Sequence, residues 1–344
     1  MTQTILPGLV AMLSLALAAC AAAKQQTCGP ADARPNAILT CAMPGFEERP
    51  YNIHLPASYD AAHPVPVVLA IHGGGGNARG AARTTCPGGD PDSPDCLHAM
   101  AARDGVAVVY PNGTSSRLVR RLRTWNAGGG TGDWQCVSGR ACKDGVDDIA
   151  YFTTLLAELA HWVAVDPSRI YATGLSNGGA MSHRLACEMA DRIAAIAPLG
   201  GANQFAATTG CAPARPVPVL QIHGTADPCW RYEGGAASCA QRDDKAKIAV
   251  EESMRIWAGI DGCGGAGDPE PFAREDGIET VRIRWGGCRG GAEVVLLRMR
   301  GGGHVWPGGW AYLRERKIGP MVTGWSANRV ILDFFHEHRL PDDN

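Results

Sequence analysis

Ser176, in the segment Gly174-Leu-Ser-Asn-Gly178, is the residue whose surroundings most clearly suggest chemistry. Branched and aromatic residues precede this Gly-x-Ser-x-Gly segment, and a helical run from Ala180 to Ala190 follows it. This context predicts a strand, a sharp turn and a helix, the arrangement that lifts a serine hydroxyl above the edge of a parallel sheet. The helix directs its unpaired N–H groups and its positive dipole end toward the serine. Ser176 is therefore the candidate nucleophile.

A serine nucleophile needs a general base, and the base needs a carboxylate that orients it. Asp227 lies in His223-Gly-Thr-Ala-Asp227 and His304 lies in the glycine-rich segment 301–309, each directly after a predicted strand. Open parallel sheets build their sites at such carboxyl ends. The sequence thus predicts that His304 takes the proton of Ser176 and that Asp227 fixes the His304 tautomer. Asp227 also precedes a proline, where an aspartate commonly forms a turn.

Other residues compete for the roles of acid and base. Asp147 and Asp148 are alternative acids, although they precede the serine and suit the first turn of a helix. His223 and His72 are alternative bases, although each lies at a strand end beside glycine, where a histidine often bonds only to local backbone. His304 is preferred because glycines flank it and allow its loop to be shaped around a substrate.

The developing oxyanion of an acyl transfer needs two fixed N–H donors. One is expected to be the backbone of Asn177, directly after the nucleophile. The other is expected from Gly74, in the segment His72-Gly-Gly-Gly-Gly-Asn77. Trp125 and Trp306 are predicted to line a substrate cleft, with packing in the core as the alternative. For Trp134, packing in the core or in a loop is an equally good interpretation.

The elements that must position these residues alternate along the chain. Predicted strands cover 51–55, 65–71, 106–110, 169–173, 194–198, 217–223, 281–285 and 293–299, and predicted helices cover 97–103, 147–163, 180–190, 246–260 and 325–338. Segment 65–71 is continuously apolar, as in a strand buried on both faces. Segment 51–55 alternates and predicts an edge strand. The pattern favours an α/β fold with a mostly parallel, doubly wound sheet, helices on both faces, and one domain over 46–344.

Composition excludes some classes of function. The formal net charge of −2 removes the broad electrostatic attraction that non-specific nucleic-acid binding requires. An apolar fraction of 45% is sufficient for a sizeable core. No Cys-x-x-Cys pair or His-rich cluster indicates zinc, and serine acyl transfer needs neither a metal nor a cofactor.

The first residues predict export. Residues 5–23 are dominated by Leu, Ala, Val and Met, so 1–23 is interpreted as a signal peptide, with an uncleaved anchor as the alternative. Leu17-Ala-Ala-Cys20 resembles a bacterial lipobox, which would make Cys20 a lipidated first residue, whereas cleavage after Ala23 would release a free enzyme. Residues 24–45 are polar and rich in Pro and Ala, and are expected to be a tether. The predicted location is the cell envelope or the exterior, with membrane contact only through a lipid anchor.

The cysteines support the same location. Of the 13 cysteines, 12 remain when Cys20 is set aside (13 − 1 = 12), and an even number in an exported chain favours disulfides. The order along the chain suggests local bridges, which are Cys28–Cys41, Cys86–Cys96, Cys136–Cys142, Cys187–Cys211, Cys229–Cys239 and Cys263–Cys288. Cys136–Cys142 would hold the long irregular segment 111–145.

Six motifs that occur together and in order carry a specific resemblance. They are His72-Gly-Gly-Gly-Gly-Asn77, Trp125-Asn126, Val146-Asp-Asp-Ile149, Gly174-Leu-Ser-Asn-Gly-Gly179, His223-Gly-Thr-Ala-Asp227 and Gly303-His-Val-Trp-Pro-Gly-Gly309. Over about residues 45 to 340 the chain resembles the polyhydroxybutyrate depolymerase / feruloyl esterase family of secreted α/β-hydrolases. The resemblance implies the α/β-hydrolase fold, a Ser176, Asp227, His304 triad and carboxylic-ester substrates. It also agrees with the bridges Cys187–Cys211 and Cys263–Cys288.

Two features differ from the family pattern. Polymer depolymerases of this type often carry a further C-terminal polymer-binding domain, and this sequence stops at Asn344. Gly74 stands where a larger residue is common. Small esters, plant cell-wall esters and polyesters are therefore all expected substrate classes. Two alternatives are a non-catalytic envelope lipoprotein that binds a glycan or polymer with the same fold, and a serine peptidase, although nothing in the sequence indicates a peptide subsite.

Overall fold

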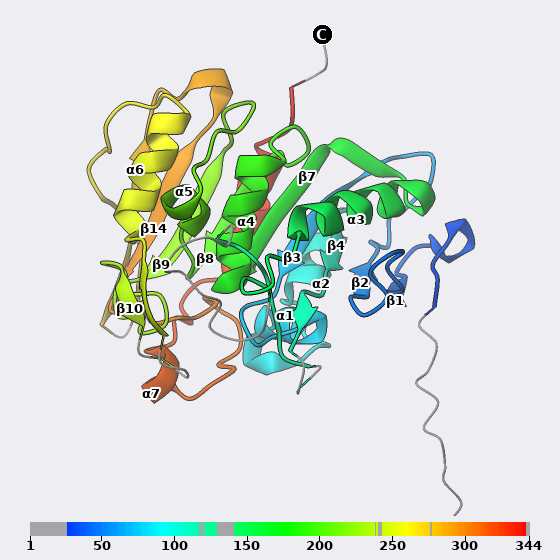
Figure 1. The fold of residues 1–344 in the computed structure, drawn as a ribbon, viewed down its shortest axis with the longest axis horizontal. Coiled ribbons are helices and arrows are strands. Elements are labelled where there is room, and N and C mark those ends of the chain that lie inside the picture. The colour runs from blue at the N-terminus through cyan, green and yellow to red at the C-terminus, as the bar shows by residue number, and fades with distance from the viewer. Residues whose placement is uncertain are drawn as a thin grey trace, which may run out of the picture.

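A ten-stranded sheet crosses the molecule between two layers of helices (Figure 1). The computed structural model describes residues 26–116, 119, 121–128, 141–237, 239, 243–275 and 277–341. In spatial order the strands of the sheet are β1 (Ile38–Cys41), β2 (Tyr51–His54), β4 (Ala107–Tyr110), β3 (Val65–Ile71), β7 (Val165–Leu175), β8 (Ala195–Leu199), β9 (Val219–Gly224), β14 (Val294–Arg300), β13 (Ile278–Trp285) and β12 (Glu270–Glu275). Two small hairpins lie outside it, β5 (Thr114–Ser115) with β6 (Arg123–Thr124) and β10 (Gly235–Ala237) with β11 (Asp243–Lys247).

The helices follow the order that the alternating pattern predicts. They are α1 (Ala78–Thr84), α2 (Leu97–Arg103), α3 (Asp148–Trp162), α4 (Asn177–Glu188), α5 (Gln204–Thr208), α6 (Val250–Ile260), α7 (Glu315–Ile318) and α8 (Ala327–His336), with short 3₁₀ turns at Pro30–Asp32, Pro87–Gly89 and Arg289–Gly291. Within the described ranges, no helix has the length and apolar character needed to cross a bilayer.

The strand directions confirm a mostly parallel sheet. The central strands β4, β3, β7, β8, β9 and β14 run parallel to one another. The outer strands β2 and β1 on one side, and β13 and β12 on the other, are antiparallel to their neighbours. The carboxyl ends of the central strands therefore meet at one edge of the sheet, which is where a parallel sheet places its site.

Two apolar cores, one on each face of the sheet, hold the helices in place. Val67, Leu69 and Ile71 of β3 pack in the core that also contains α3, α4 and α6. Val68 and Ala70 face the other core, with α1, α2 and α8. Successive side chains of a strand point to opposite faces, so a strand between two helical layers must be apolar at every position. This confirms the interpretation of segment 65–71 as a strand buried on both faces.

The expectation of a tether over 24–45 is wrong for its described part. β1 pairs with β2 along Ile38–Cys41, and the disulfide Cys28–Cys41 and the buried Met43 join this segment to the core. Since β1 lies outside β2, the segment 51–55 is the second strand and not the edge strand. A strand of four residues is too short to show a clear hydrophobic period in the sequence. This one is held by the disulfide and by its pairing with β2.

The other edge strand, β12, was also absent from the sequence-based prediction. Its sequence, Glu270-Pro-Phe-Ala-Arg-Glu275, contains a proline and three charges. Proline is tolerated on edge strands, and charges there discourage pairing with other chains.

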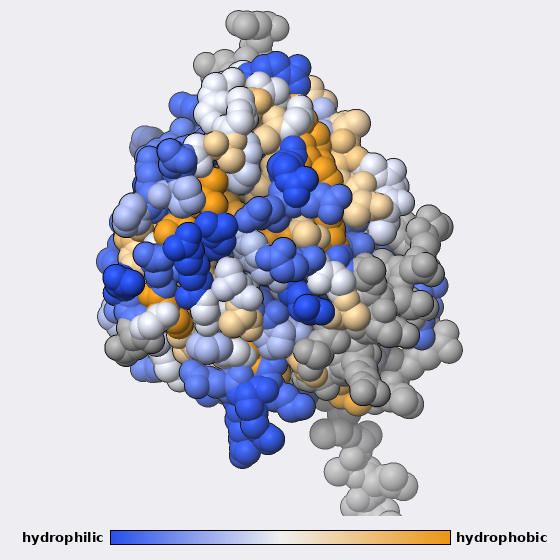
Figure 2. Space-filling model, turned by 90° about the vertical axis from the view of Figure 1, so that its left-hand side faces the viewer, coloured by the Kyte–Doolittle hydropathy of each residue, from blue (hydrophilic) through white to orange (hydrophobic). Residues whose placement is uncertain are grey.

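Hydrophilic side chains cover much of the face shown in Figure 2, the side on which α6 and β10 lie in Figure 1, with smaller apolar areas between them.

Five of the six predicted disulfides are confirmed. They are Cys28–Cys41, Cys86–Cys96, Cys187–Cys211, Cys229–Cys239 and Cys263–Cys288. Cys136 lies outside the described residues, so Cys136–Cys142 stays a prediction. Disulfides in these numbers fit a protein that matures in an oxidising compartment.

The two aspartates at the start of α3 have different roles. Asp147 caps the helix, as expected, because its Oδ1 accepts the Ala150 N–H at 2.9 Å. Asp148 is fully buried and forms an ion pair with Arg49, at 2.5 Å between Oδ1 and Nη2. Burial raises the pKa of the Asp148 carboxyl, although the neighbouring Arg49 charge opposes this. Asp148 Oδ2 also accepts the Asn126 N–H at 2.6 Å, so this pair fixes the segment around Asn126.

Replacing Arg49 by Met leaves the Asp148 carboxylate buried without its partner. We expect the free energy of unfolding to fall by ~3–5 kcal/mol, as is typical when one partner of a buried ion pair is removed. Urea unfolding monitored by circular dichroism measures this. The matched control is Arg300→Met, which removes a half-exposed partner of Glu279 and is expected to cost no more than ~1 kcal/mol. Equal losses in the two variants would contradict the assignment.

Asp261 makes the stability of the fold depend on pH. The residue is buried at the end of α6, its Oδ1 accepts the Val217 N–H at 3.0 Å, and its Oδ2 has no hydrogen-bond partner among the described residues. Burial raises the pKa of Asp261 to about 7, against the opposing effects of the Val217 N–H and Arg215. Between the ordinary aspartate pKa and this value, the folded chain holds a proton that the unfolded chain releases.

The free energy of unfolding should therefore fall as pH rises from ~4 to ~7, because the folded state binds more protons over this range. In the variant Asp261→Asn, this contribution, on the order of 1–3 kcal/mol, should disappear, because an amide does not titrate. The amide oxygen still offers an acceptor to the Val217 N–H. Urea unfolding at pH 5 and pH 8 tests the difference. Identical pH slopes for the two proteins would exclude Asp261 as the source.

Candidate active site

Ser176 lies on a strained turn between β7 and α4. Its φ of 63° and ψ of −121° are unusual for a residue with a side chain, and such strain concentrates at functional sites. A Cβ atom at Gly178 would overlap the Ile71 carbonyl of β3, so only glycine allows α4 to start this close to the sheet. The Ser176 N–H donates to Leu199 O at 2.8 Å, which fixes the turn against the end of β8. The strand, turn and helix predicted around Ser176 are confirmed.

Asp227 and His304 meet at the carboxyl ends of β9 and β14. These strands are parallel neighbours in register, so the loops that follow them lie side by side. The His304 Nδ1 and Asp227 Oδ2 atoms are 2.6 Å apart, and both side chains are buried. Asp227 Oδ1 accepts the N–H groups of Cys229 and Trp230 at 2.7 and 2.8 Å. The structure thus pairs the acid and base that the sequence predicts.

Asp227 is held in its ionised form. Burial alone raises the pKa of its carboxyl, but the charge of His304 and the hydrogen bonds from His223 and His304 outweigh burial, so the pKa lies below its ordinary value. An ionised Asp227 can only accept hydrogen bonds. His304 therefore carries its proton on Nδ1 toward Asp227, and its Nε2 is left to accept a proton.

The His304 ring lies close to the end of the Ser176 turn. Gly200, directly after β8, has a φ of 53°, and a Cβ atom there would come within 3.0 Å of the His304 ring. The neighbouring Gly201 packs against the Ser176 carbonyl. Among the described residues, neither Ser176 Oγ nor His304 Nε2 has a hydrogen-bond partner. Such bonds are often long in free hydrolases and tighten when the substrate binds.

The two backbone N–H groups expected to bind the oxyanion, those of Gly74 and Asn177, have no acceptor among the described residues. Asn177 is the first residue of α4, so its N–H has no acceptor within the helix. Gly74 lines the cavity next to Ser176, and its N–H has no acceptor among the described residues. The flanking Gly75 N–H donates to Arg123 O at 2.8 Å, and the Gly76 N–H donates to Gly73 O at 2.9 Å. The loop that carries Gly74 is thereby fixed.

His72 has a structural role that excludes it as the base. Its Nδ1 lies 2.8 Å from Gly73 O, and its Nε2 accepts the Gly113 N–H at 3.0 Å. Burial lowers the pKa of His72 to about 3, so the ring is neutral and both nitrogens are occupied. Through its bonds to Gly73 and Gly113, His72 helps to fix the loop that carries Gly74.

Trp125 does not line the substrate cleft, so that expectation is corrected. Its side chain is fully buried, its ring packs against Phe152, and its Nε1 donates to His72 O at 3.0 Å. Its backbone holds the side chain of Asn177, since the Trp125 N–H donates to Asn177 Oδ1 at 2.7 Å and Asn177 Nδ2 donates to Trp125 O at 3.0 Å. Trp125 therefore supports the turn from the core.

A cavity of about 450 Å³ opens above Ser176. Trp306 lines it, as predicted, and Trp310, Tyr312, Leu313 and Leu122 complete a largely apolar wall. The last four residues were not predicted. Trp310 and Tyr312 continue the His304 loop, and the recurrence of aromatic residues directly after the base was the available signal.

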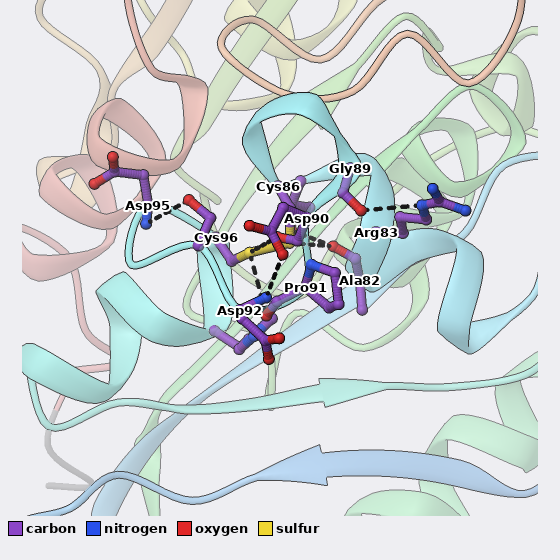
Figure 3. Close-up of a disulfide and its surroundings, with 12 residues drawn as sticks. Ala82, Arg83, Cys86, Gly89, Asp90, Pro91, Asp92, Asp95 and Cys96 are labelled. Atoms are coloured by element: carbon purple, nitrogen blue, oxygen red, sulfur yellow. Dashed lines mark hydrogen bonds between the residues drawn. A yellow bond between two sulfur atoms is a disulfide. The ribbon is translucent and has the colours of Figure 1, made fainter.

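The outer wall of the cavity rests on a disulfide-closed loop. Cys86–Cys96 closes this loop behind α1, and Arg83 Nε donates to Gly89 O at 3.0 Å across it (Figure 3). The Arg83 guanidinium lies 4.0 Å from the centre of the Trp310 ring. The Trp310 N–H donates to Thr84 O at 3.0 Å. Trp310 is therefore held both by its backbone N–H and by the contact of Arg83 with the face of its ring.

Asn328 of α8 supports the other tryptophan. Its Oδ1 accepts the Trp306 Nε1–H at 2.9 Å, while its Nδ2 donates to the carbonyls of Thr85 and Asp95 at 2.7 Å each. One buried amide thus joins the cavity wall, the disulfide-closed loop and the last helix. The orientation of Trp306 does not depend on a substrate.

Two groups of potential metal ligands occur in the described part of the chain. They are Cys86 with Cys96 and His98, and Asp227 with Cys229 and His304. All three cysteines are in disulfides, so they offer no thiolate. Trp134, the signal segment 1–23 and the lipobox with Cys20 lie outside the described residues.

Comparison with known proteins gives a consistent chemical class. No family model matches the chain. Feruloyl esterase B of Piromyces equi is 30% identical over 220 residues, which are 62% of this chain and 37% of that protein. Feruloyl esterase D of Neurospora crassa is 26% identical over 303 residues, 86% of this chain and 87% of that protein. The chain thus spans little more than a third of the first relative and most of the second.

Among solved structures, acetyl xylan esterase from Aspergillus awamori is 17% identical, with a TM-score of 0.49, over 75% of this chain and 89% of that one. The two relatives similar in sequence carry names that refer to ester hydrolysis. The chain is therefore related in sequence to carboxylic-ester hydrolases, and it has the mostly parallel α/β sheet on which its acid–base pair is built.

Proposed function

We propose that this protein is a serine carboxylic-ester hydrolase of the α/β-hydrolase fold, with Ser176, Asp227 and His304 as its triad. The observation that carries the proposal is the buried 2.6 Å contact between His304 Nδ1 and Asp227 Oδ2 beside the strained turn of Ser176. A buried acid–base pair at the carboxyl ends of parallel strands, next to a serine on such a turn, suits nucleophilic acyl transfer. The feruloyl esterase names of the relatives agree with this chemistry.

The reaction follows from the positions of the groups. His304 Nε2 takes the proton of Ser176 Oγ as the oxygen attacks the ester carbonyl, and Asp227 stabilises the imidazolium that forms. The Gly74 and Asn177 N–H groups donate to the oxyanion of the tetrahedral intermediate, a contribution of ~3–4 kcal/mol for each donor in comparable enzymes. The protonated His304 gives its proton to the departing alcohol. Water that His304 activates then cleaves the acyl–Ser176 bond and releases the acid.

The cavity favours an acyl group with an aromatic ring. Trp306, Trp310 and Tyr312 line the cavity together with Ser176, and aromatic rings gain energy from stacking or edge contacts beyond their buried area. Hydroxycinnamoyl esters, as in feruloyl esterases, are therefore the proposed substrate class. Hydroxybutyrate oligomers, the other half of the family resemblance, stay a prediction from sequence.

Export belongs to the same proposal. The five disulfides support maturation in an oxidising compartment. We infer a secreted or envelope-bound enzyme, with Cys20 as the lipidated residue in the second case. Intact-mass measurement of the mature protein distinguishes a diacylated Cys20 from a free terminus.

Ser176→Ala should abolish esterase activity, because the acyl-enzyme cannot form without the hydroxyl. We expect kcat/KM for p-nitrophenyl butyrate to fall by ~10⁴-fold or more, and labelling by a fluorophosphonate to disappear. Ser182→Ala is the matched control, since Ser182 lies on the same helix and its hydroxyl donates only to Gly178 O. It should keep both properties. Labelling of Ser176→Ala at the wild-type rate would assign the nucleophile elsewhere.

Trp310→Ala should distinguish aromatic from small acyl groups. Loss of the ring removes one wall of the cavity, so we expect kcat/KM for methyl ferulate to fall by ~10-fold. Hydrolysis of p-nitrophenyl acetate should change less than ~3-fold, since an acetyl group has little surface to bury against the cavity wall. Both rates are measured on the same preparation, which makes the acetate ester an internal control. An equal loss on both esters would contradict aromatic recognition at this wall.

A further inference from the structure

Asp227 has a second histidine partner that the mechanism above does not use. His223 Nε2 lies 3.3 Å from Asp227 Oδ2 and 2.8 Å from Trp230 O, and the side chains of His223 and Asp227 are fully buried. His223 is the last residue but one of β9, and Asp227 follows four residues later. The same carboxylate oxygen therefore faces the rings of both His223 and His304.

A chain of hydrogen bonds fixes the proton on His223. It starts at Trp257 Nε1, which can only donate and lies 2.9 Å from His183 Nδ1. His183 Nδ1 must accept, so His183 carries its proton on Nε2 and donates to Gln221 Oε1 at 2.9 Å. Gln221 then directs Nε2 toward His223 Nδ1 at 3.2 Å. His223 Nδ1 accepts this bond, which leaves the His223 proton on Nε2, where Trp230 O is the nearer acceptor at 2.8 Å and Asp227 Oδ2 the more distant one at 3.3 Å.

Burial keeps His183 neutral. Trp257, His183, Gln221 and His223 are all fully buried, and burial lowers the pKa of His183 to about 4. A second proton on His223 would bring an N–H against the amide N–H of Gln221, so the chain opposes it. Of the other titratable groups near His223, the ring of Tyr232 lies 6.1 Å away between centroids, and burial raises its pKa. The carboxylate of Asp227 faces His223 directly, and the buried Lys247 ammonium lies against the same loop, where it donates to Cys229 O at 3.0 Å.

We propose that His223 is a positioning residue of the Asp227 turn. Its Nε2–H donates to Trp230 O and lies 3.3 Å from Asp227 Oδ2, and the Trp230 N–H in turn donates to Asp227 Oδ1, so that the carboxylate is held toward His304. Gln221, His183 and Trp257 fix the tautomer that this requires. The inference rests on the proposed esterase function and extends it to four buried residues on β9, α4 and α6. It also explains why His223, at hydrogen-bond distance from the acid, is not a competing base.

The first test replaces the donor. His223→Phe removes it, and we expect kcat to fall about ten-fold, because the turn whose N–H groups bind Asp227 Oδ1 loses its bond at Trp230 O and Asp227 Oδ2 loses a nearby N–H. KM should change little, since His223 does not touch the cavity. The acid limb of the pH profile of kcat/KM should move to higher pH, because a carboxylate with one donor fewer favours protonated His304. His223→Gln, whose amide can donate from a similar place, should restore most of kcat.

The second test acts at a distance from Asp227. Gln221→Glu keeps the shape of the side chain but removes the donor to His223 Nδ1, so the proton of His223 moves to Nδ1 and leaves Nε2 without one. We expect a loss of kcat similar to that of His223→Phe, because Nε2 then has no hydrogen to donate. In the background His223→Gln the same substitution should have little effect, since that amide donates without help from residue 221.

Thermal unfolding of each variant verifies the fold, and His223→Gln with Gln221→Glu decides the matter if His223→Phe does not fold. Unchanged kcat and pH profile in Gln221→Glu, or additive losses in the double variant, would overturn the positioning role. Failure of the esterase proposal gives a different result, in which Ser176→Ala keeps full activity. The two inferences can therefore fail separately.

Discussion

The contact between His304 and Asp227 depends on one property of the sheet, the parallel pairing of β9 with β14 in register. Because both strands end at the same level, the loops that follow bring together two side chains 77 residues apart. In the chain, β14 follows the edge strand β12 and its antiparallel neighbour β13. The outer strands therefore serve the site by returning the chain to the central parallel block.

The same edge of the sheet holds the nucleophile by close packing. Gly178 allows α4 to approach β3, and Gly200 leaves room for the His304 ring beside the Ser176 turn. Buried polar groups then fix each loop. His72 and Trp125 hold the Gly74 loop and Asn177 from one side, and Asn328 holds Trp306 from the other. In this arrangement most of the site is preorganised before a substrate binds, which is what electrostatic stabilisation of a transition state requires.

The sequence predicted those features that arise from local patterns. The buried strand β3, the helix α3 and the turn at Ser176 each have a clear period or motif, and the loops of Asp227 and His304 follow strands that could be recognised. The sequence could not predict β1 and β12, which owe their positions to a disulfide and to an edge position. It also did not separate Trp125 from Trp306, because a tryptophan in the core and one in a cavity wall look alike in sequence. Nor could it show that Asp148, beside a true helix cap, forms a buried ion pair with Arg49.

The central claim is that Ser176 becomes acylated during turnover, and it is tested most directly by trapping the intermediate. A pre-steady-state reaction with p-nitrophenyl butyrate is quenched in acid within milliseconds, and the enzyme is digested and analysed by mass spectrometry. The structure predicts a burst of nitrophenol and one butyryl group on the peptide that contains Ser176. A butyryl group on another residue, or turnover without any covalent intermediate, would contradict the account.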